Sequence, residues 1–266
     1  MAAAVVLTTA GIKAADKFSA PTRTVAGPVA GPDGCPEEMV YVTIAGGGFC
    51  LDRYEASAGE KCPAKLPANQ DETRQNLDAV DCRPAAIPGQ LPWRNISQNQ
   101  AAIACAKAGK RLASNKEWLQ AALGTPDKAA GWTADDCHVA KNWTSGHPGQ
   151  TGSARQCVSA AGAFDMIGNV WEWVDGTVYE GKFKEKILPD QGFIKSVDED
   201  ALANETDKAG GDLNYNQDYF WIKNKGTRGI ARGGYWDNQA DAGLYAAYVV
   251  SLPSFSGDGI GFRCAK

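Results

Sequence analysis

The sequence lacks the short motifs that identify most enzymes. It contains only two histidines, His138 and His147, and a surface or core role is favoured for both. It contains no HExxH zinc motif, no Gly-x-Ser-x-Gly nucleophile turn and no phosphate-binding glycine loop. The paired acids at 135–136 and 198–200 occur in polar stretches, where solvated carboxylates are the simplest interpretation. These absences favour a protein without catalytic residues.

Clusters of basic residues and long apolar runs are also absent. The net charge is −4 and the pI is about 5.3, whereas a nucleic-acid partner requires a basic face. No apolar run approaches the length of a membrane span. Residues 1–34 are small, aperiodic and rich in proline, glycine and alanine, and we interpret them as a leader or flexible arm. We therefore expect neither a nucleic-acid partner nor a membrane span.

Eight cysteines are spread along the chain, and no two of them form a CxxC pair. A zinc knuckle or a thioredoxin-like site is therefore disfavoured. An even number of cysteines favours four disulfides in an oxidising compartment, although hyperthermophiles also keep disulfides in the cytosol. Eight buried free thiols are the less favoured alternative.

The first ordered segment is predicted to be a β-hairpin. Residues 39–44 alternate β-branched and other side chains up to a glycine-rich turn at 45–48, and 49–55 form a plausible second strand. Residues 56–90 contain proline, glycine and two cysteines, and we expect a disulfide-linked loop there.

Two helices are predicted from capping boxes. Ser97 lies three residues before a glutamine and begins a helix that ends at Gly109. Ser114 lies three residues before a glutamate and begins a helix over 116–123. Ile103 belongs to the apolar stripe that is expected to pack the first helix on a sheet.

The remainder of the chain consists of turns and short aromatic segments. Residues 176–228 are polar with charges of both signs, and we interpret them as a surface insertion. The fold class is predicted as α+β, with two helices and a loop-rich antiparallel sheet.

Five stretches in order resemble the sulfatase-modifying-factor, or formylglycine-generating-enzyme, family. They are 39–49 with Asp-Arg-Tyr-Glu at 52–55, Pro-Trp-Arg at 92–94, 105–112 with Glu-Trp at 117–118, Asp-Met-Ile-Gly-Asn-Val-Trp-Glu-Trp at 165–173, and Arg-Gly-Gly-Tyr-Trp at 232–236 with Gly-Phe-Arg-Cys at 261–264. The resemblance implies that residues 35–266 form one domain with the C-type lectin fold of that family.

The family also implies one disulfide, between Cys105 and Cys264. The other six cysteines are then expected to pair with neighbours in the sequence: Cys35 with Cys50, Cys62 with Cys82, and Cys137 with Cys157.

A calcium site is a further implication of the resemblance. The matching positions are Asp165, Gly168, Val170 and Glu172, which offer two carboxylates and two backbone carbonyls. Hard oxygen ligands suit Ca²⁺. The alternative is a structural turn with solvated acids.

The oxidases of the family bind copper through two cysteines, and this chain does not have them. The equivalent positions are Asn238 and Gly243, and no cysteine occurs between Cys157 and Cys264. Copper(I) requires soft thiolates, so we expect no copper and no oxidase activity. A sulfoxide synthase of the ergothioneine type, which is similar in this domain, would need an iron-binding helical domain for which these 266 residues leave no room.

The last segment, 232–266, resembles the variable proteins of diversity-generating retroelements, which end in a similar Ile-Gly-Phe-Arg-Cys-Ala-Lys. The resemblance implies that adenine-directed mutagenesis rewrites the codons between fixed frame positions. Apart from Gln239, all the candidates are reachable from an asparagine codon by changing adenines. The candidate ligand-binding positions are Tyr235, Asp237, Asn238, Gln239, Asp241, Leu244, Tyr248, Val250, Ser251, Phe255, Gly257 and Asp258.

The predicted function is therefore non-catalytic binding of a variable protein or surface ligand. Tyr235, Tyr248 and Phe255 are the expected aromatic anchors, and Trp236 is expected to be a more buried part of the frame. The expected location is secreted, on a cell surface or on a phage virion. An ordinary turn-rich edge of the fold, in an enzyme or decayed enzyme of the formylglycine-generating type, is the alternative.

Overall fold

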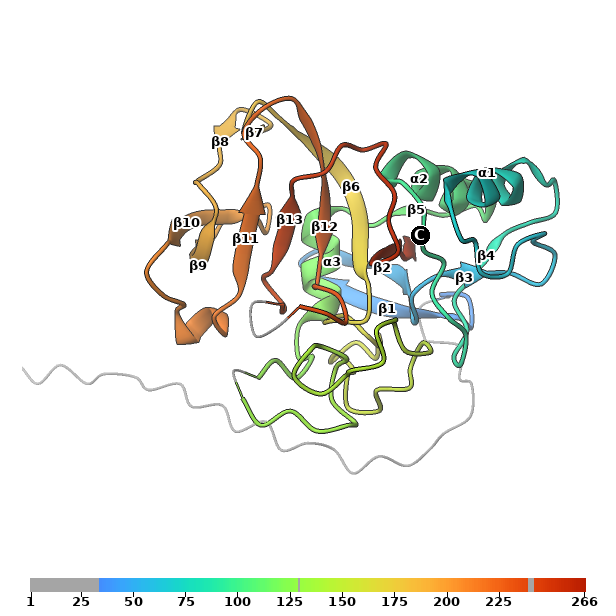
Figure 1. Ribbon diagram of the computed structural model, residues 1–266, viewed down its shortest axis with the longest axis horizontal. Helices are drawn as coiled ribbons and strands as arrows, with labels where there is room; N and C mark the ends of the chain where they lie inside the picture. Colours follow the sequence, from blue (N-terminus) through green and yellow to red (C-terminus); the bar gives the residue numbers. More distant parts are fainter. Residues whose placement is uncertain (1–33, 129, 239–241) are drawn as a thin grey trace, which may run out of the picture.

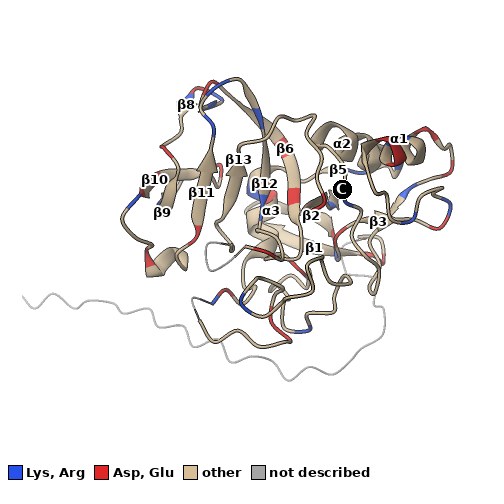
Figure 2. Ribbon diagram, in the orientation of Figure 1, with Lys and Arg blue, Asp and Glu red and all other residues tan. Residues whose placement is uncertain are grey.

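The computed structural model describes residues 34–128, 130–238 and 242–266, so the expected leader lies almost entirely outside it. The described chain contains three α-helices and fifteen short strands in an α+β arrangement, which confirms the predicted class (Figure 1). Within these ranges, no helix is both long enough and apolar enough to span a bilayer. Acidic and basic residues are interspersed along the chain (Figure 2).

The largest sheet has nine strands in the order β10-β9-β11-β13-β12-β6-β7-β8, and β14 pairs with β6. Most pairs are antiparallel, but β11 runs parallel to β13, and β14 runs parallel to β6. The strands are β6 (Trp171–Tyr179), β7 (Lys182–Phe183), β8 (Lys186–Ile187), β9 (Gly192–Val197), β10 (Ala203–Asp207), β11 (Tyr219–Ile222), β12 (Thr227–Arg232), β13 (Ala247–Val249) and β14 (Ile260–Phe262).

A four-stranded sheet, β1-β2-β15-β5, joins the two ends of the domain. It contains the predicted hairpin, β1 (Met39–Ile44) and β2 (Gly47–Asp52). The C-terminal β15 (Cys264–Ala265) pairs with both β2 and β5 (Arg111–Leu112). A third, two-stranded sheet pairs β3 (Ser57–Ala58) with β4 (Pro84–Ala85).

Both predicted helices are confirmed, with their capping boxes, as α2 (Gln98–Lys107) and α3 (Asn115–Ala122). The apolar stripe assigned to α2 was wrong: Ile103 is 51% exposed, and the buried positions are Gln98, Ala101, Ala104 and Cys105.

A third helix, α1 (Gln70–Asp78), lies within the segment predicted to be a loop. Its Asn69 N-cap accepts a hydrogen bond from the Glu72 amide. The helix is almost entirely polar, so it has no apolar periodicity for a sequence pattern to detect.

Residues 176–228 are not only a surface insertion. They contribute β7, β8, β9, β10 and β11 to the large sheet and one 3₁₀ turn, Leu213–Tyr215. Ile194, Leu202 and Phe220 are fully buried in the core. Apolar residues in the segment 176–228 alternate with polar ones, so its polar average composition did not reveal that the segment contributes to the core.

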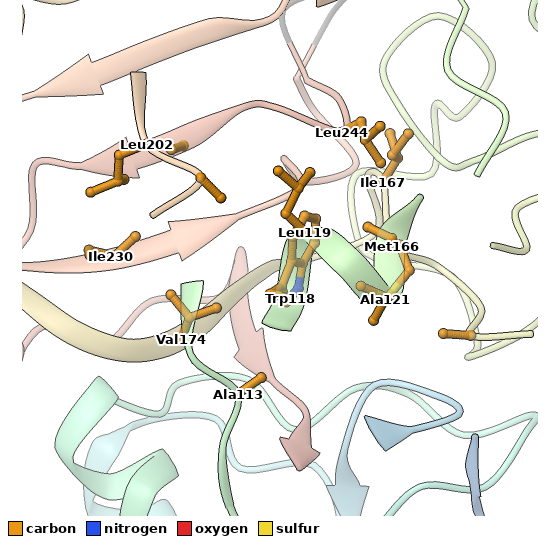
Figure 3. Packing of buried hydrophobic residues seen from close by; sticks show 14 of the residues in the cluster. Ala113, Trp118, Leu119, Ala121, Met166, Ile167, Val174, Leu202, Ile230 and Leu244 are labelled. Atoms are coloured by element: carbon orange, nitrogen blue, oxygen red, sulfur yellow. The ribbon is translucent and has the colours of Figure 1, made fainter. Parts of the chain in front are cut away.

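Two hydrophobic clusters form the core. The first includes Trp118 and Leu119 of α3, which lie close to Val174, Ile230 and Leu244 from the strand region (Figure 3). The second brings α2 together with Trp93, Trp173 and Phe262.

Four disulfides connect the domain in the pairing expected from the sequence. They join Cys35 to Cys50, Cys62 to Cys82, Cys105 to Cys264, and Cys137 to Cys157. No cysteine is left free.

Candidate functional site

An aromatic cavity of about 240 Å³ lies where the C-terminal segment meets the large sheet. Trp171 at the start of β6 and Tyr248 at the centre of β13 lie in its wall, with ring centroids 5.6 Å apart. Phe255, which is 46% exposed, is the most accessible of its aromatic rings. The full lining is Trp171, Tyr235, Tyr248, Phe255, Gly257, Asp258, Gly259 and Ile260.

Five of the twelve candidate ligand-binding residues line this cavity. They are Tyr235, Tyr248, Phe255, Gly257 and Asp258. Ser251 also lies close, because its hydroxyl is 3.0 Å from the Tyr248 hydroxyl. The structure therefore brings the three expected aromatic anchors together in one cavity.

The other candidates are placed differently. Leu244 is only 7% exposed and packs in the first core cluster, so its side chain does not reach the cavity. Asn238 accepts a hydrogen bond from the Tyr235 amide and so holds a turn. Asp237 is exposed and Val250 is half-buried. Gln239 and Asp241 lie outside the described residues.

Two tryptophans outside the set of candidate ligand-binding residues, Trp236 and Trp171, also belong to this region. Trp236 is 7% exposed, as expected for a frame residue, and packs edge-on against Tyr235. Sequence reasoning missed Trp171 as a cavity residue. Trp171 belongs to the motif at 165–173 that carries the family resemblance, but nothing in the sequence places it beside residues almost 80 positions later.

The loop at 252–259 is held to the rest of the protein mainly through its backbone. Five donors from earlier parts of the chain bind carbonyl oxygens of this loop. They are the amides of Asn95 (to Gly257, 2.9 Å), Asn99 (to Pro253, 3.2 Å) and Trp171 (to Gly259, 2.9 Å), and the side chains of Arg94 (to Asp258, 3.2 Å) and Gln70 (to Ser254, 3.2 Å). None of these contacts depends on the identity of a loop side chain.

Behind the cavity, a buried ion pair joins β6 to the C-terminal strands. The Arg263 Nε atom donates to both oxygens of Glu172, at 2.9 and 2.7 Å, and Trp118 Nε1 donates to Glu172 Oε2 at 2.6 Å. The Arg263 Nη2 atom donates to Glu172 Oε1 as well, at 2.5 Å, and to the Phe164 carbonyl, while Nη1 donates to the carbonyls of Asp52 and Arg53. Burial acts to lower the Arg263 pKa, but the adjacent Glu172 outweighs it and the pKa is raised.

The predicted calcium ligands do not fit a cation well. Both oxygens of Glu172 already accept hydrogen bonds, and Arg263 supplies the positive charge that calcium would bring. Asp165 Oδ2 accepts from the Gly152 amide at 2.6 Å, and burial raises the pKa of Asp165 to about 7. In the described part of the chain, no three acidic, histidine or cysteine side chains are grouped to hold a metal.

The other two predicted calcium ligands, Gly168 and Val170, take part in the packing and hydrogen bonding of the loop. The Gly168 backbone has φ of 72°, and a Cβ there would lie 2.1 Å from the His138 carbonyl oxygen, so only glycine fits. The Val170 amide donates to Glu55 Oε1 at 3.2 Å. The loop is thus a closely packed turn, and its calcium site stays a prediction.

The positions equivalent to the copper cysteines offer no alternative thiolate. Asn238 holds a turn, and Gly243 lies against the carboxylates of Asp127 and Asp218. All eight cysteines of the sequence are in disulfides, so no thiolate is available for copper(I).

Comparison with known proteins supports the resemblance seen in the sequence. The family model described as "Sulfatase-modifying factor enzyme 1-like domain" matches residues 42–266. Hercynine oxygenase of Mycolicibacterium thermoresistibile is 26% identical over 211 residues, which are 74% of this chain and 41% of that protein. The chain therefore spans less than half the length of this relative.

The solved structures that match this chain include the following three proteins. The Major Tropism Determinant P3c variant matches with a TM-score of 0.43 and 18% identity, over 87% of this chain and 52% of its own. PvdO from Pseudomonas aeruginosa matches at 0.45 and 20%, over 88% and 85% of the two chains. Treponema denticola variable protein 1 matches at 0.41 and 14%, over 85% and 98%.

Proposed function

The chain belongs to the family of the sulfatase-modifying factor enzyme 1-like domain, with its C-type lectin fold, and we propose that it has a non-catalytic ligand-binding function. In this proposal a retroelement diversifies residues 232–266, so that the specificity of binding varies while the frame is kept. The observation that carries the proposal is the backbone anchoring of the cavity loop.

Backbone anchoring separates the fold of the loop from its side chains. A typical hydrogen bond contributes about 1 kcal/mol, and none of the five bonds to loop carbonyls uses a side chain of 252–259. A loop held by its own side chains would lose such contacts with each substitution. The arrangement therefore tolerates rewriting of surface codons, as a diversified binding site requires.

The cavity is suited to a protruding group of a larger ligand. Its volume of about 240 Å³ is below the roughly 300–1,000 Å³ of pockets that enclose a small molecule. Trp171 belongs to β6 and supplies a constant wall, while Tyr235, Tyr248 and Phe255 supply rings at positions proposed to vary. Rigid aromatic side chains lose little entropy on binding, which favours recognition by a pre-organised surface.

The four disulfides support the location in this proposal. They fit an extracellular protein, and we place the molecule in a secreted form, on a cell surface or on a virion. There a protein or another surface molecule would be the ligand.

Sequencing tests the proposal directly. The C-terminal coding region is read across many cells of one culture, together with the neighbouring genome. We expect substitutions at the codons for Tyr235, Tyr248 and Phe255, matching adenines in a nearby template copy. An invariant segment without a template would contradict diversification and favour the alternative, an enzyme of the formylglycine-generating type or a decayed relative of it.

A pair of variants tests the physical basis separately. Phe255→Ser changes an exposed cavity residue and is expected to alter stability by no more than about 0.5 kcal/mol. Leu244→Ser changes a core residue and is expected to cost about 3 kcal/mol or more. Comparable losses in urea unfolding would show that the cavity loop depends on its side chains after all.

A further inference from the structure

A buried carboxylate, Asp218, and a half-buried one, Asp127, meet beneath residues 243–246, next to the cavity segment. Asp127 Oδ2 accepts from the Leu244 amide at 2.9 Å, and Asp218 Oδ2 accepts from the Tyr245 amide at 2.6 Å. A Cβ built on Gly243 would lie 2.0 Å from Asp218 Oδ1 and 2.6 Å from Asp127 Oδ2. The two carboxylates therefore face each other across Gly243 and occupy the space that a side chain there would need.

Arg232 is the positive charge that acts on Asp218. Its Nη2 atom donates to the Leu244 carbonyl at 3.2 Å, and its Nη1 atom donates to the Ala201 carbonyl at 2.8 Å. Asp218 Oδ1 and Arg232 Nε are both buried and have no hydrogen-bond partner. The guanidinium thus acts on one of the two acids, and one oxygen of that carboxylate has no hydrogen-bond partner.

Tyr245 lies next to the two carboxylates, and the Asn216 side chain donates a hydrogen bond to Asp127. The ring of Tyr245 packs edge-on against Tyr215 at 4.9 Å, and burial together with Tyr215 and the two carboxylates raises the Tyr245 pKa. Burial raises the pKa of Asp127 to about 6. Burial, and then the charge of Asp127, raise the pKa of Asp218 well above its usual range.

We propose that Asp127 and Asp218 hold a proton between them and, with Arg232, clamp the backbone of residues 243–246 more firmly in mild acid than in mild alkali. All three are positioning residues, because they bind only main-chain atoms of the segment. The importance of the clamp for binding rests on the proposed function, since this backbone leads directly into β13 and Tyr248.

The direction of the pH dependence follows from the number of protons that the clamp binds when it is closed and when it is released. When residues 243–246 are released, the carboxylates are hydrated and regain ordinary pKa values, so the closed clamp binds more protons. Closure is therefore favoured as the pH falls towards 5 and weakened as it rises to 8. With a pKa of about 6 when closed and 3.8 when open, Asp127 alone changes the closure equilibrium about tenfold between these pH values.

Amide hydrogen exchange measures this equilibrium without a ligand. The probes are the Leu244 and Tyr245 amides of the full chain, with rates corrected for the intrinsic effect of pH. We expect their protection to fall about tenfold from pH 5 to pH 8. Protection that is constant or rises with pH would overturn the proposal.

Asp136, a carboxylate whose pKa is lowered rather than raised, provides the internal control. The Thr133 amide donates to Asp136 Oδ2 at 2.6 Å, and Lys128 lies 2.7 Å from Asp136 Oδ1. Burial opposes the effect of Lys128, but the Asp136 pKa is lowered overall. The protection of the Thr133 amide is therefore not expected to fall over the same pH range.

Substitution identifies the groups responsible. Replacing both Asp127 and Asp218 by asparagine keeps acceptors for the Leu244 and Tyr245 amides and removes both titrating groups, so the pH dependence at these amides should disappear. Asp127→Asn alone removes one titrating group and the charge that raises the Asp218 pKa, so it should weaken the pH dependence relative to the unaltered protein, and it serves as the test if the double variant folds poorly. An undiminished pH dependence in either folded variant would overturn the clamp. Because no ligand is used, the result is independent of whether residues 232–266 are diversified.

Discussion

The disulfide between Cys105 and Cys264 joins residues 159 positions apart and fastens β15, at the end of the binding segment, to α2. In the chain-entropy model a cross-link of this span stabilises by about 5 kcal/mol. The disulfide between Cys62 and Cys82 spans 20 positions and is expected to contribute about 3 kcal/mol. All four cysteines are buried, so the two bonds differ mainly in span.

The test compares two double variants, each with both cysteines of one disulfide replaced by alanine. Denaturant unfolding of each gives the free energy of unfolding, with the slope checked for two-state behaviour. We expect the Cys105→Ala, Cys264→Ala protein to be less stable than the Cys62→Ala, Cys82→Ala protein by about 2 kcal/mol. Equal losses, or the reverse order, would refute the view that the long cross-link is the main covalent restraint on the binding segment.

Three further changes test the site. Glu172→Gln leaves Arg263 buried without its carboxylate and should cost roughly 3 kcal/mol in unfolding free energy, whereas Asp200→Asn, which removes the partner of exposed Lys184, should cost much less. Gly243→Ala should lose about 1–3 kcal/mol, because its methyl group collides with two carboxylates, and a neutral result would contradict the packing there. Chelation with EDTA should leave the Tm unchanged, since Glu172 is satisfied by Arg263, and a rise in Tm on adding calcium would show that the loop binds it.

Local signals in the sequence predicted much of the frame. The capping boxes at Ser97 and Ser114 located α2 and α3, because cap and helix are neighbours in the chain. The alternating run at 39–44 located the opening hairpin for the same reason. The number of cysteines and the family motifs were enough to expect four disulfides.

Local signals failed where burial depends on distant partners. The polar helix α1 has no apolar stripe, and its N-cap Asn69 alone does not distinguish a helix from a turn. The prediction for Leu244 as a ligand contact did not anticipate the core that forms around it from α3 and the segment 176–228.

The sequence by itself determined the family, the α+β class, the cysteine framework and the aromatic residues available for binding. Only the tertiary structure decided which of those residues share a cavity, and it placed Trp171 beside Tyr248. It also set Asp127 against Asp218, 91 positions later, beneath the loop. The physical reason is that burial, charge pairing and cavity shape depend on contacts between strands far apart in the chain, whereas caps and turns are set by neighbouring residues.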